Sequence, residues 1–237
     1  MFSVVIILLM GSAATAMTGL FFSKSFIGGV KLHTELHKYF SLFQASIPLG
    51  LTLIFNLIYF HIDSIILTLT RPTVEVGIYG LAFKVFELPL VLPTFFMNAL
   101  YPVMLGVRGY SLNKLILKSA GILLFVSSLL TVIVWFAAPL LVFIKSDFAE
   151  SISALRILSL GLPFFFLSSL TMWTLITKKQ RMKLVYIYGF SMLINIGLNV
   201  IFTPVYGYSA AAWITVFSEG VVLLLSIGAV AKTLSRE

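Results

Sequence analysis

Seven continuously apolar blocks of roughly 20 to 30 residues run through this sequence and limit what it can fold into. They cover residues 1–22, 41–70, 77–104, 119–144, 155–177, 184–202 and 208–231. A helix of about 20 residues spans the roughly 30 Å of hydrocarbon in a bilayer. A membrane β-strand would instead alternate apolar and polar residues over about 10 residues, which these blocks do not do. The blocks therefore predict an all-α, polytopic membrane protein with about seven transmembrane helices.

The composition supports a membrane environment. Hydrophobic residues make up 60% of the chain and charged residues 10%, and the mean hydropathy is +1.10. A soluble globule of 237 residues would need more polar side chains than this to cover its surface. The chain contains no cysteine, which removes thiolate metal sites and cysteine nucleophiles from consideration.

The net charge of +8 is explained by the positions of the basic residues. One set of alternate loops and the C-terminus hold Lys24, Lys31, Lys38, Arg108, Lys114, Lys118, Lys178, Lys179, Arg181, Lys183, Lys232 and Arg236. The other set holds only Arg71, Lys145 and Arg156. By the positive-inside rule the first set faces the cytoplasm, which predicts a multi-pass protein of the cell membrane with its C-terminus inside and its N-terminus outside. A nucleic-acid partner is not needed to explain the charge.

The sequence suggests three parts. Residues 1–22 form an isolated transmembrane helix that lacks the basic segment of a signal peptide, so we expect it to belong to a truncated N-terminal lobe. Residues 23–40 contain Gly28 and Gly29 and then an amphipathic pattern, which predicts a cytoplasmic linker on the membrane surface. Residues 41–237 form a C-terminal lobe of six helices.

Four stretches carry a family resemblance. The run IPLGLTLIFNLIYFHIDSIIL, followed by VGIYGLAFKVFELPLVLPTFFMNALYPVM, resembles the start of the C-terminal lobe of O-antigen type polysaccharide flippases. These belong to the multidrug/oligosaccharidyl-lipid/polysaccharide exporter superfamily. The later runs ALRILSLGLPFFFLSSL and NIGLNVIFTPVYGYSAAAWITVFSE resemble the fourth span and the last hairpin of that lobe. The resemblance covers roughly residues 40 to 231.

The resemblance implies a function as well as a fold. In the family, two six-helix lobes face each other across a central cavity, and alternating access moves a lipid-diphosphate-linked oligosaccharide between leaflets. This chain corresponds to the last helix of the first lobe plus the whole second lobe. We therefore expect it to need the missing N-terminal lobe or a second copy. The alternatives are a multidrug/cation antiporter of the same superfamily, and a non-transporting truncated protein that docks glycosyltransferases or a polymerase.

Three charged residues lie inside the second and third blocks, where each charge costs on the order of 2.5 to 3.5 kcal/mol. Asp63 lies eight residues before Arg71, and Lys84 lies about eight residues after Val76, so both are expected roughly 12 Å below the outer surface. One interpretation is a structural ion pair between Asp63 and Lys84, with Glu87 sharing the lysine. Alternatively, Asp63 titrates or binds a coupling cation, or Lys84 faces the cavity and attracts a diphosphate headgroup.

The last two blocks hold a second polar group on either side of a turn expected at residues 204–207. Asn195 and Asn199 share one helix face, and Thr215 and Glu219 share another, because residues four apart are neighbours on a helix. Asn195 and Thr215 are expected in the same layer as Asp63. Oxygen atoms that converge there suit Na⁺ or H⁺ coupling, and the alternative is that these side chains only hold helices together by hydrogen bonds.

Catalytic motifs are not present in the sequence. It contains no nucleophile elbow, no phosphate-binding loop and no zinc-binding helix motif. We therefore predict neither an enzyme nor a cofactor or metal site, and any transport would be driven by an ion or substrate gradient.

Overall fold

The chain folds into two compact units, Met1–Ala45 and Ser46–Glu237. The computed structural model describes residues 2–27, 36–143 and 149–235. In the first unit, α1 (Phe2–Ile27) extends past the predicted end of the first span at residue 22. The linker predicted at residues 23–40 lies partly outside the described residues, because residues 28–35 are not among them. Its last part, residues 36–40, belongs to α2 (Leu36–Thr70).

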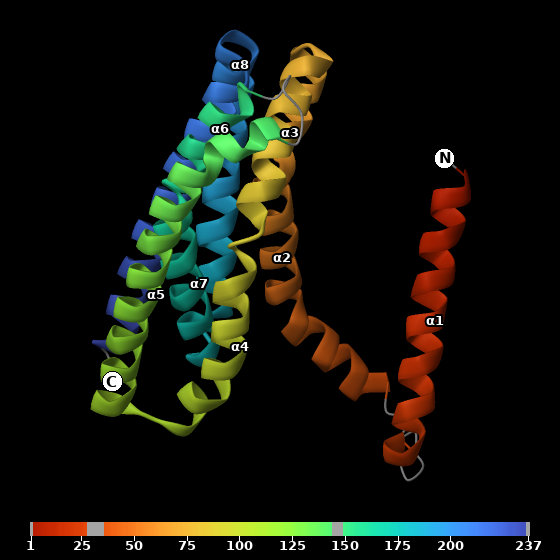
Figure 1. Cartoon of the computed structure of the whole chain (residues 1–237). Helices are drawn as coiled ribbons and strands as arrows, with labels where there is room; N and C mark the ends of the chain where they lie inside the picture. Colours follow the sequence, from red (N-terminus) through yellow and green to blue (C-terminus); the bar gives the residue numbers. More distant parts are fainter. Residues whose placement is uncertain (1, 28–35, 144–148, 236–237) are drawn as a thin grey trace. The chain divides into compact units, whose positions relative to one another are not determined.

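The described residues of the second unit form helices and connecting turns, with no strand among them. Figure 1 shows these helices running side by side as a bundle. After α2 the elements are α3 (Thr73–Glu87), α4 (Val91–Gly106), α5 (Gly109–Ala137), the 3₁₀ helix η1 (Ala138–Phe143), α6 (Ser151–Ser159), α7 (Leu162–Thr177) and α8 (Arg181–Leu234).

The 54-residue helix α8 is a hairpin of two helices. Its backbone leaves the helical region at Gly207, where φ is 64° and ψ is −146°. The Lys183 ammonium donates a hydrogen bond of 2.8 Å to the Thr233 hydroxyl, so the two ends of α8 lie together. In a straight helix they would be about 75 Å apart. Figure 1 shows the light blue half reaching one end of the bundle and the dark blue half returning from it.

The candidate membrane spans are the helices that are long and apolar enough to cross a bilayer. Four of the described helical segments are long and apolar enough to cross a membrane: α2, α3 with α4, α5, and α8. The pair α6 and α7, bent by 42° at its break, makes a fifth candidate when it is counted as one span. Because α8 is a hairpin of 54 residues, its length is sufficient for two spans rather than one. The predicted all-α, polytopic membrane fold is confirmed.

Two of these crossings are broken at positions where the sequence explains the break. Between α3 and α4 the helix is interrupted around Pro89, which lacks the amide hydrogen that an intact helix would use. Between α6 and α7 the chain bends at Leu160 and Gly161, and Pro163 follows in the first turn of α7, where proline is well tolerated.

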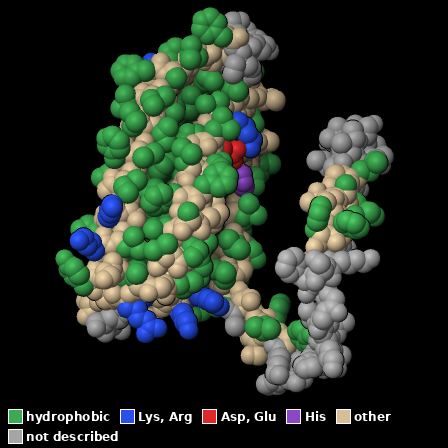
Figure 2. Space-filling view, turned by 60° about the horizontal axis from the view of Figure 1, so that its bottom comes forward, with side chains coloured by type: hydrophobic (Ala, Val, Ile, Leu, Met, Phe, Trp, Pro, Cys, Tyr) green, Lys and Arg blue, Asp and Glu red, His purple; other side chains and the backbone are tan. Residues whose placement is uncertain are grey.

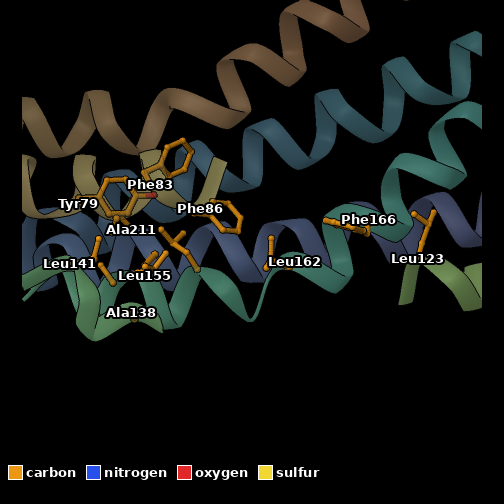
Figure 3. Close-up of a cluster of buried hydrophobic side chains, with 14 of the residues drawn as sticks. Tyr79, Phe83, Phe86, Leu123, Ala138, Leu141, Leu155, Leu162, Phe166 and Ala211 are labelled. Atoms are coloured by element: carbon orange, nitrogen blue, oxygen red, sulfur yellow. The ribbon is translucent and has the colours of Figure 1, made fainter. Parts of the chain in front are cut away.

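The core of the second unit lies where α3, α6, α7 and α8 meet. Helix α7 packs against α8, α5 and α4, and α3 packs against α6. In Figure 3 the rings of Tyr79, Phe83 and Phe86 lie near Leu155 of α6 and Ala211 of α8. Large apolar side chains also cover the outside, as expected for helices whose outer faces meet lipid rather than water.

The turn of the α8 hairpin is tied to the start of α3. The Arg71 guanidinium bonds the Glu75 carboxylate with an Nε–Oε1 distance of 3.0 Å and donates a second bond of 3.3 Å to the Pro204 carbonyl. The backbone N–H of Tyr208 donates to Glu75 at 3.4 Å. A β-carbon added at Gly207 would lie 3.2 Å from the Arg71 Nε and closer still to the Glu75 carboxylate. Glycine is therefore required here both by its backbone conformation and by space.

Candidate functional site

Asp63 is buried in the second unit with three hydrogen-bond donors around its carboxylate. It lies on α2 and is 1% exposed. The hydroxyls of Tyr79, from α3, and Thr215, from α8, both donate to Oδ2, the latter at 3.0 Å. The backbone N–H of Ser64 donates to Oδ1 at 2.6 Å. One carboxylate thus links α2 to the next helix, α3, and to α8, which is far away in the sequence.

Glu219 repeats this arrangement one helical turn further along α8. Its side chain is 3% exposed. The Tyr59 hydroxyl, from α2, donates to Oε2 at 3.0 Å, and the Ser168 hydroxyl, from α7, donates to Oε1. Both carboxylates are therefore held by hydroxyl groups of neighbouring helices.

The two carboxylates form a ladder between α2 and α8. Tyr59 and Asp63 are one turn apart on α2, and Thr215 and Glu219 are one turn apart on α8, so each pair shares a helix face. The rungs join Asp63 to Thr215 and Tyr59 to Glu219. We call these four residues, with the flanking donors Tyr79 and Ser168, the carboxylate ladder. Its rungs require α2 and the second half of α8 to run antiparallel.

No lysine or arginine in the described part of the chain pairs with either carboxylate of the ladder. The ion pairs there join Arg71 to Glu75 and Lys84 to Glu87. Burial of an ionised carboxylate without a compensating charge is very unfavourable, even when hydroxyl groups donate to it. The ladder is therefore suited to take up a proton or a small cation, because either would neutralise the buried charge and the surrounding oxygen atoms would complete the site.

The interpretation in which Asp63 and Lys84 form an ion pair was wrong. The Lys84 ammonium lies 2.6 Å from the Glu87 carboxylate, and its side chain is 74% exposed. The depth estimate failed because α3 begins at Thr73, directly after the turn, rather than near Val76. Lys84 therefore lies 11 residues after the start of α3 and on an outward face, whereas Asp63 is buried seven residues before the end of α2. Lys84 and Glu87 form an ion pair with each other and do not join the ladder.

Asn195 is buried, but its hydrogen bonds run along its own helix. Its Oδ1 accepts a bond of 3.1 Å from the Asn199 amide, whose own oxygen accepts a bond of 2.8 Å from the Thr203 hydroxyl. The structure thus brings Thr215 to Asp63 as expected and places Glu219 one turn away. It shows no hydrogen bond from Asn195 to Asp63.

A cavity of about 240 Å³ lies against the ladder. Glu219 and Ser168 form part of its wall, so one end of the ladder is accessible from this space. The remaining lining residues come from four helical segments and are both polar and apolar: Asn56, Phe60, Leu90, Pro93, Thr94, Phe165, Ser169, Met172 and Tyr188. A polar group can therefore approach a buried carboxylate here.

The sequence analysis missed three donors of the ladder, namely Tyr59, Tyr79 and Ser168. The sequence contained a signal for two of these donors, Tyr59 and Tyr79. Tyr59 is four residues before Asp63, and Tyr79 lies as far after Arg71 as Asp63 lies before it, so both fall near the predicted layer. Ser168 gave no such signal, because α7 contains several hydroxyl residues and only packing selects one.

The second unit is thus a multi-pass, all-α membrane bundle with a buried, hydroxyl-bound pair of carboxylates. The model of a protein family described as "Polysaccharide biosynthesis protein" matches residues 1–108. The chain is therefore similar to this family over a stretch that includes Tyr59, Asp63 and Tyr79. Neither the curated proteins nor the solved structures include one that matches the chain.

Proposed function

We propose that the chain takes part in the export of lipid-linked oligosaccharide for cell-surface polysaccharide synthesis, as a flippase coupled to Na⁺ or H⁺. The observation that carries this proposal is the carboxylate ladder, which lies beside a cavity with polar and apolar lining and lacks a cationic partner in the described residues. The family match over residues 1–108 supports polysaccharide as the class of cargo.

The chemistry of the ladder supports the proposal of ion coupling. When Asp63 binds a cation or a proton, its charge is neutralised, and the hydroxyls of Tyr79 and Thr215 no longer have to donate to it. The hydrogen bonds that tie α2 to α3 and α8 then weaken or rearrange. Because each of these bonds joins two helices, ion binding and helix packing are energetically linked, as coupled transport requires.

The oligosaccharide would move through a cavity that this lobe shares with a second lobe, supplied by further sequence or by a second copy. In this arrangement the polar wall formed by Asn56, Thr94, Ser169 and Glu219 faces the sugar headgroup. The lipid tail stays in the bilayer, where the apolar outer faces of the helices accommodate it.

One observation favours a multidrug/cation antiporter as the second candidate. The cavity wall contains Phe60, Phe165 and Met172 beside the Glu219 carboxylate. Aromatic rings and a buried carboxylate together suit an organic cation. In that case Glu219 would bind the drug directly rather than a coupling ion.

Deletion of the gene, followed by extraction of membrane lipids, tests the proposal. We expect diphosphate-linked oligosaccharide to accumulate on the cytoplasmic leaflet, and the wild-type gene to reverse this. Asp63→Asn should fail to restore export at the normal ion concentration, whereas Lys84→Gln, which changes a charge outside the ladder, should restore it. Intact surface polysaccharide after deletion, together with new sensitivity to cationic drugs, would favour the antiporter instead.

A further inference from the structure

A second cavity lies at the opposite end of the bundle from the α8 turn. Its volume is about 430 Å³. It lies between the α4–α5 turn and the α7–α8 turn. The lining residues are Met104, Leu105, Val107, Arg108, Leu112, Thr177, Lys178 and Lys179. The apolar members come from α4, α5 and the turn between them, and the basic members come from both turns.

This cavity carries a concentrated positive charge. Arg108 and Lys179 are exposed, and neither side chain has a hydrogen bond or an ion pair to the part of the chain that is described. Both turns and the helix ends next to them lack acidic residues. Figure 2 shows Lys and Arg side chains gathered along the lower edge of the bundle, with no red side chain beside them. Among the described residues that line the cavity, an anion therefore meets only attractive side-chain charges.

The backbone also favours an anion at this position. Helix α5 begins at Gly109 without a side-chain cap, and Leu112 in its first turn lines the cavity. The positive end of the helix dipole thus adds to the charge of the side chains.

Lys179 occupies a left-handed backbone conformation, with φ at 56°. Its N–H bonds the Ile176 carbonyl, and the Gln180 N–H bonds the Leu175 carbonyl, which closes the end of α7. Glycine or asparagine is the usual residue at such a helix end. A lysine here accepts backbone strain and places a charge at the cavity, which points to a role beyond folding.

We propose that this cavity binds the phosphate or diphosphate headgroup of a membrane lipid. The headgroup lies between Arg108 and Lys179 at the end of the spans, and the first part of the acyl or prenyl chain lies against Met104, Leu105 and Leu112. This combination of a basic rim and an apolar wall fits an anionic lipid at the membrane surface. The inference does not depend on transport, since a lipid that stabilises the bundle would bind in the same way.

Native mass spectrometry of the full chain in detergent, titrated with defined lipids, tests the proposal. The probes are dioleoylphosphatidylglycerol, undecaprenyl diphosphate and, as a zwitterionic comparison, dioleoylphosphatidylcholine. The double variant Arg108→Gln/Lys179→Gln removes two charges from the cavity. The matched control Lys114→Gln/Lys118→Gln removes two exposed charges from the same end of α5, outside the cavity.

The cavity variant should bind the anionic probe about 25-fold more weakly, at about fivefold per basic residue, and the control should bind it nearly as well as wild type. If the cavity variant binds phosphatidylglycerol more weakly, the natural ligand is a phospholipid. If it binds undecaprenyl diphosphate more weakly, the natural ligand is the carrier lipid. The proposal would be overturned if both variants bound the anionic probe equally weakly, or if the cavity variant bound it as tightly as wild type. Lys179→Gly separates binding from folding, because it should weaken binding about fivefold while the melting temperature stays equal or rises.

Discussion

The Tyr59 hydroxyl donates a hydrogen bond of 3.0 Å to the Glu219 carboxylate, across 160 positions of the sequence. Both side chains are buried, and they belong to α2 and α8. This bond and the one from Thr215 to Asp63 join α2 to α8 at successive turns. The bundle is therefore closed by polar contacts at the same place where it holds its buried carboxylates.

Replacing Tyr59 by Phe removes one donor from Glu219 and preserves the ring. We expect a destabilisation of about 1–3 kcal/mol, since a buried carboxylate oxygen is left with fewer partners. The measurement is the melting temperature of the purified protein. Tyr186→Phe, at an exposed position of α8, is the matched control and should change little. An unchanged melting temperature in Tyr59→Phe would show that the bond contributes nothing to stability.

Replacing Thr215 by Val removes the hydroxyl donor to Asp63 with almost no change in shape. If Asp63 and Thr215 together form the cation site, the half-saturating ion concentration for transport should rise about 10-fold or more, as for the loss of a bond of about 1.5–3 kcal/mol to a charged group. The assay is ion-dependent translocation in proteoliposomes. Thr215→Ser keeps the hydroxyl and should behave like wild type. A Val variant with wild-type ion dependence would exclude Thr215 from the site.

Gly207→Ala should destabilise the α8 hairpin. A residue with a β-carbon in this conformation costs about 1–3 kcal/mol, and here it would also displace the Glu75 carboxylate. Gly220→Ala is the control within the same hairpin, because no atom lies within 4 Å of its added carbon. Alanine in a helix interior is favoured over glycine by about 0.5–1 kcal/mol. In thermal unfolding, the melting temperature should therefore fall for Gly207→Ala and rise for Gly220→Ala. A change in the same direction for both variants would contradict the turn geometry.

The bond between Lys183 and Thr233 should contribute to the closure of the hairpin at its other end. A double-mutant cycle with Lys183→Met and Thr233→Val measures it. We expect a coupling free energy of about 0.5–1.5 kcal/mol in unfolding experiments, because the pair is partly buried and charged on one side. Strictly additive effects of the two substitutions would indicate that the bond does not form in the membrane.

Much of the architecture was predictable because it depends on local properties. The free energy of placing a helix in lipid is approximately a sum over its own residues, so apolar blocks and charged loops are sufficient to predict crossings. The turn expected at 204–207 was also found, since Pro204 and Gly207 act on their own stretch of backbone. The family match over residues 1–108 supports the resemblance in the second and third blocks at the level of polysaccharide biosynthesis.

The partners of the buried charges depended on the three-dimensional packing. The sequence placed Asp63 and Thr215 in one layer, but it also placed Lys84 there, because the depth of a residue depends on where its helix starts. Helix α3 begins a few residues earlier than expected, and as a result Tyr79, rather than Lys84, lies beside Asp63. Ser168 donates to Glu219 only because α7 and α8 pack with the faces that carry these two residues in contact. The sequence thus determined the membrane crossings, through the local free energy of transfer into lipid. The tertiary structure alone decided the hydrogen bonds of the carboxylates, because those depend on the rotation and offset of whole helices.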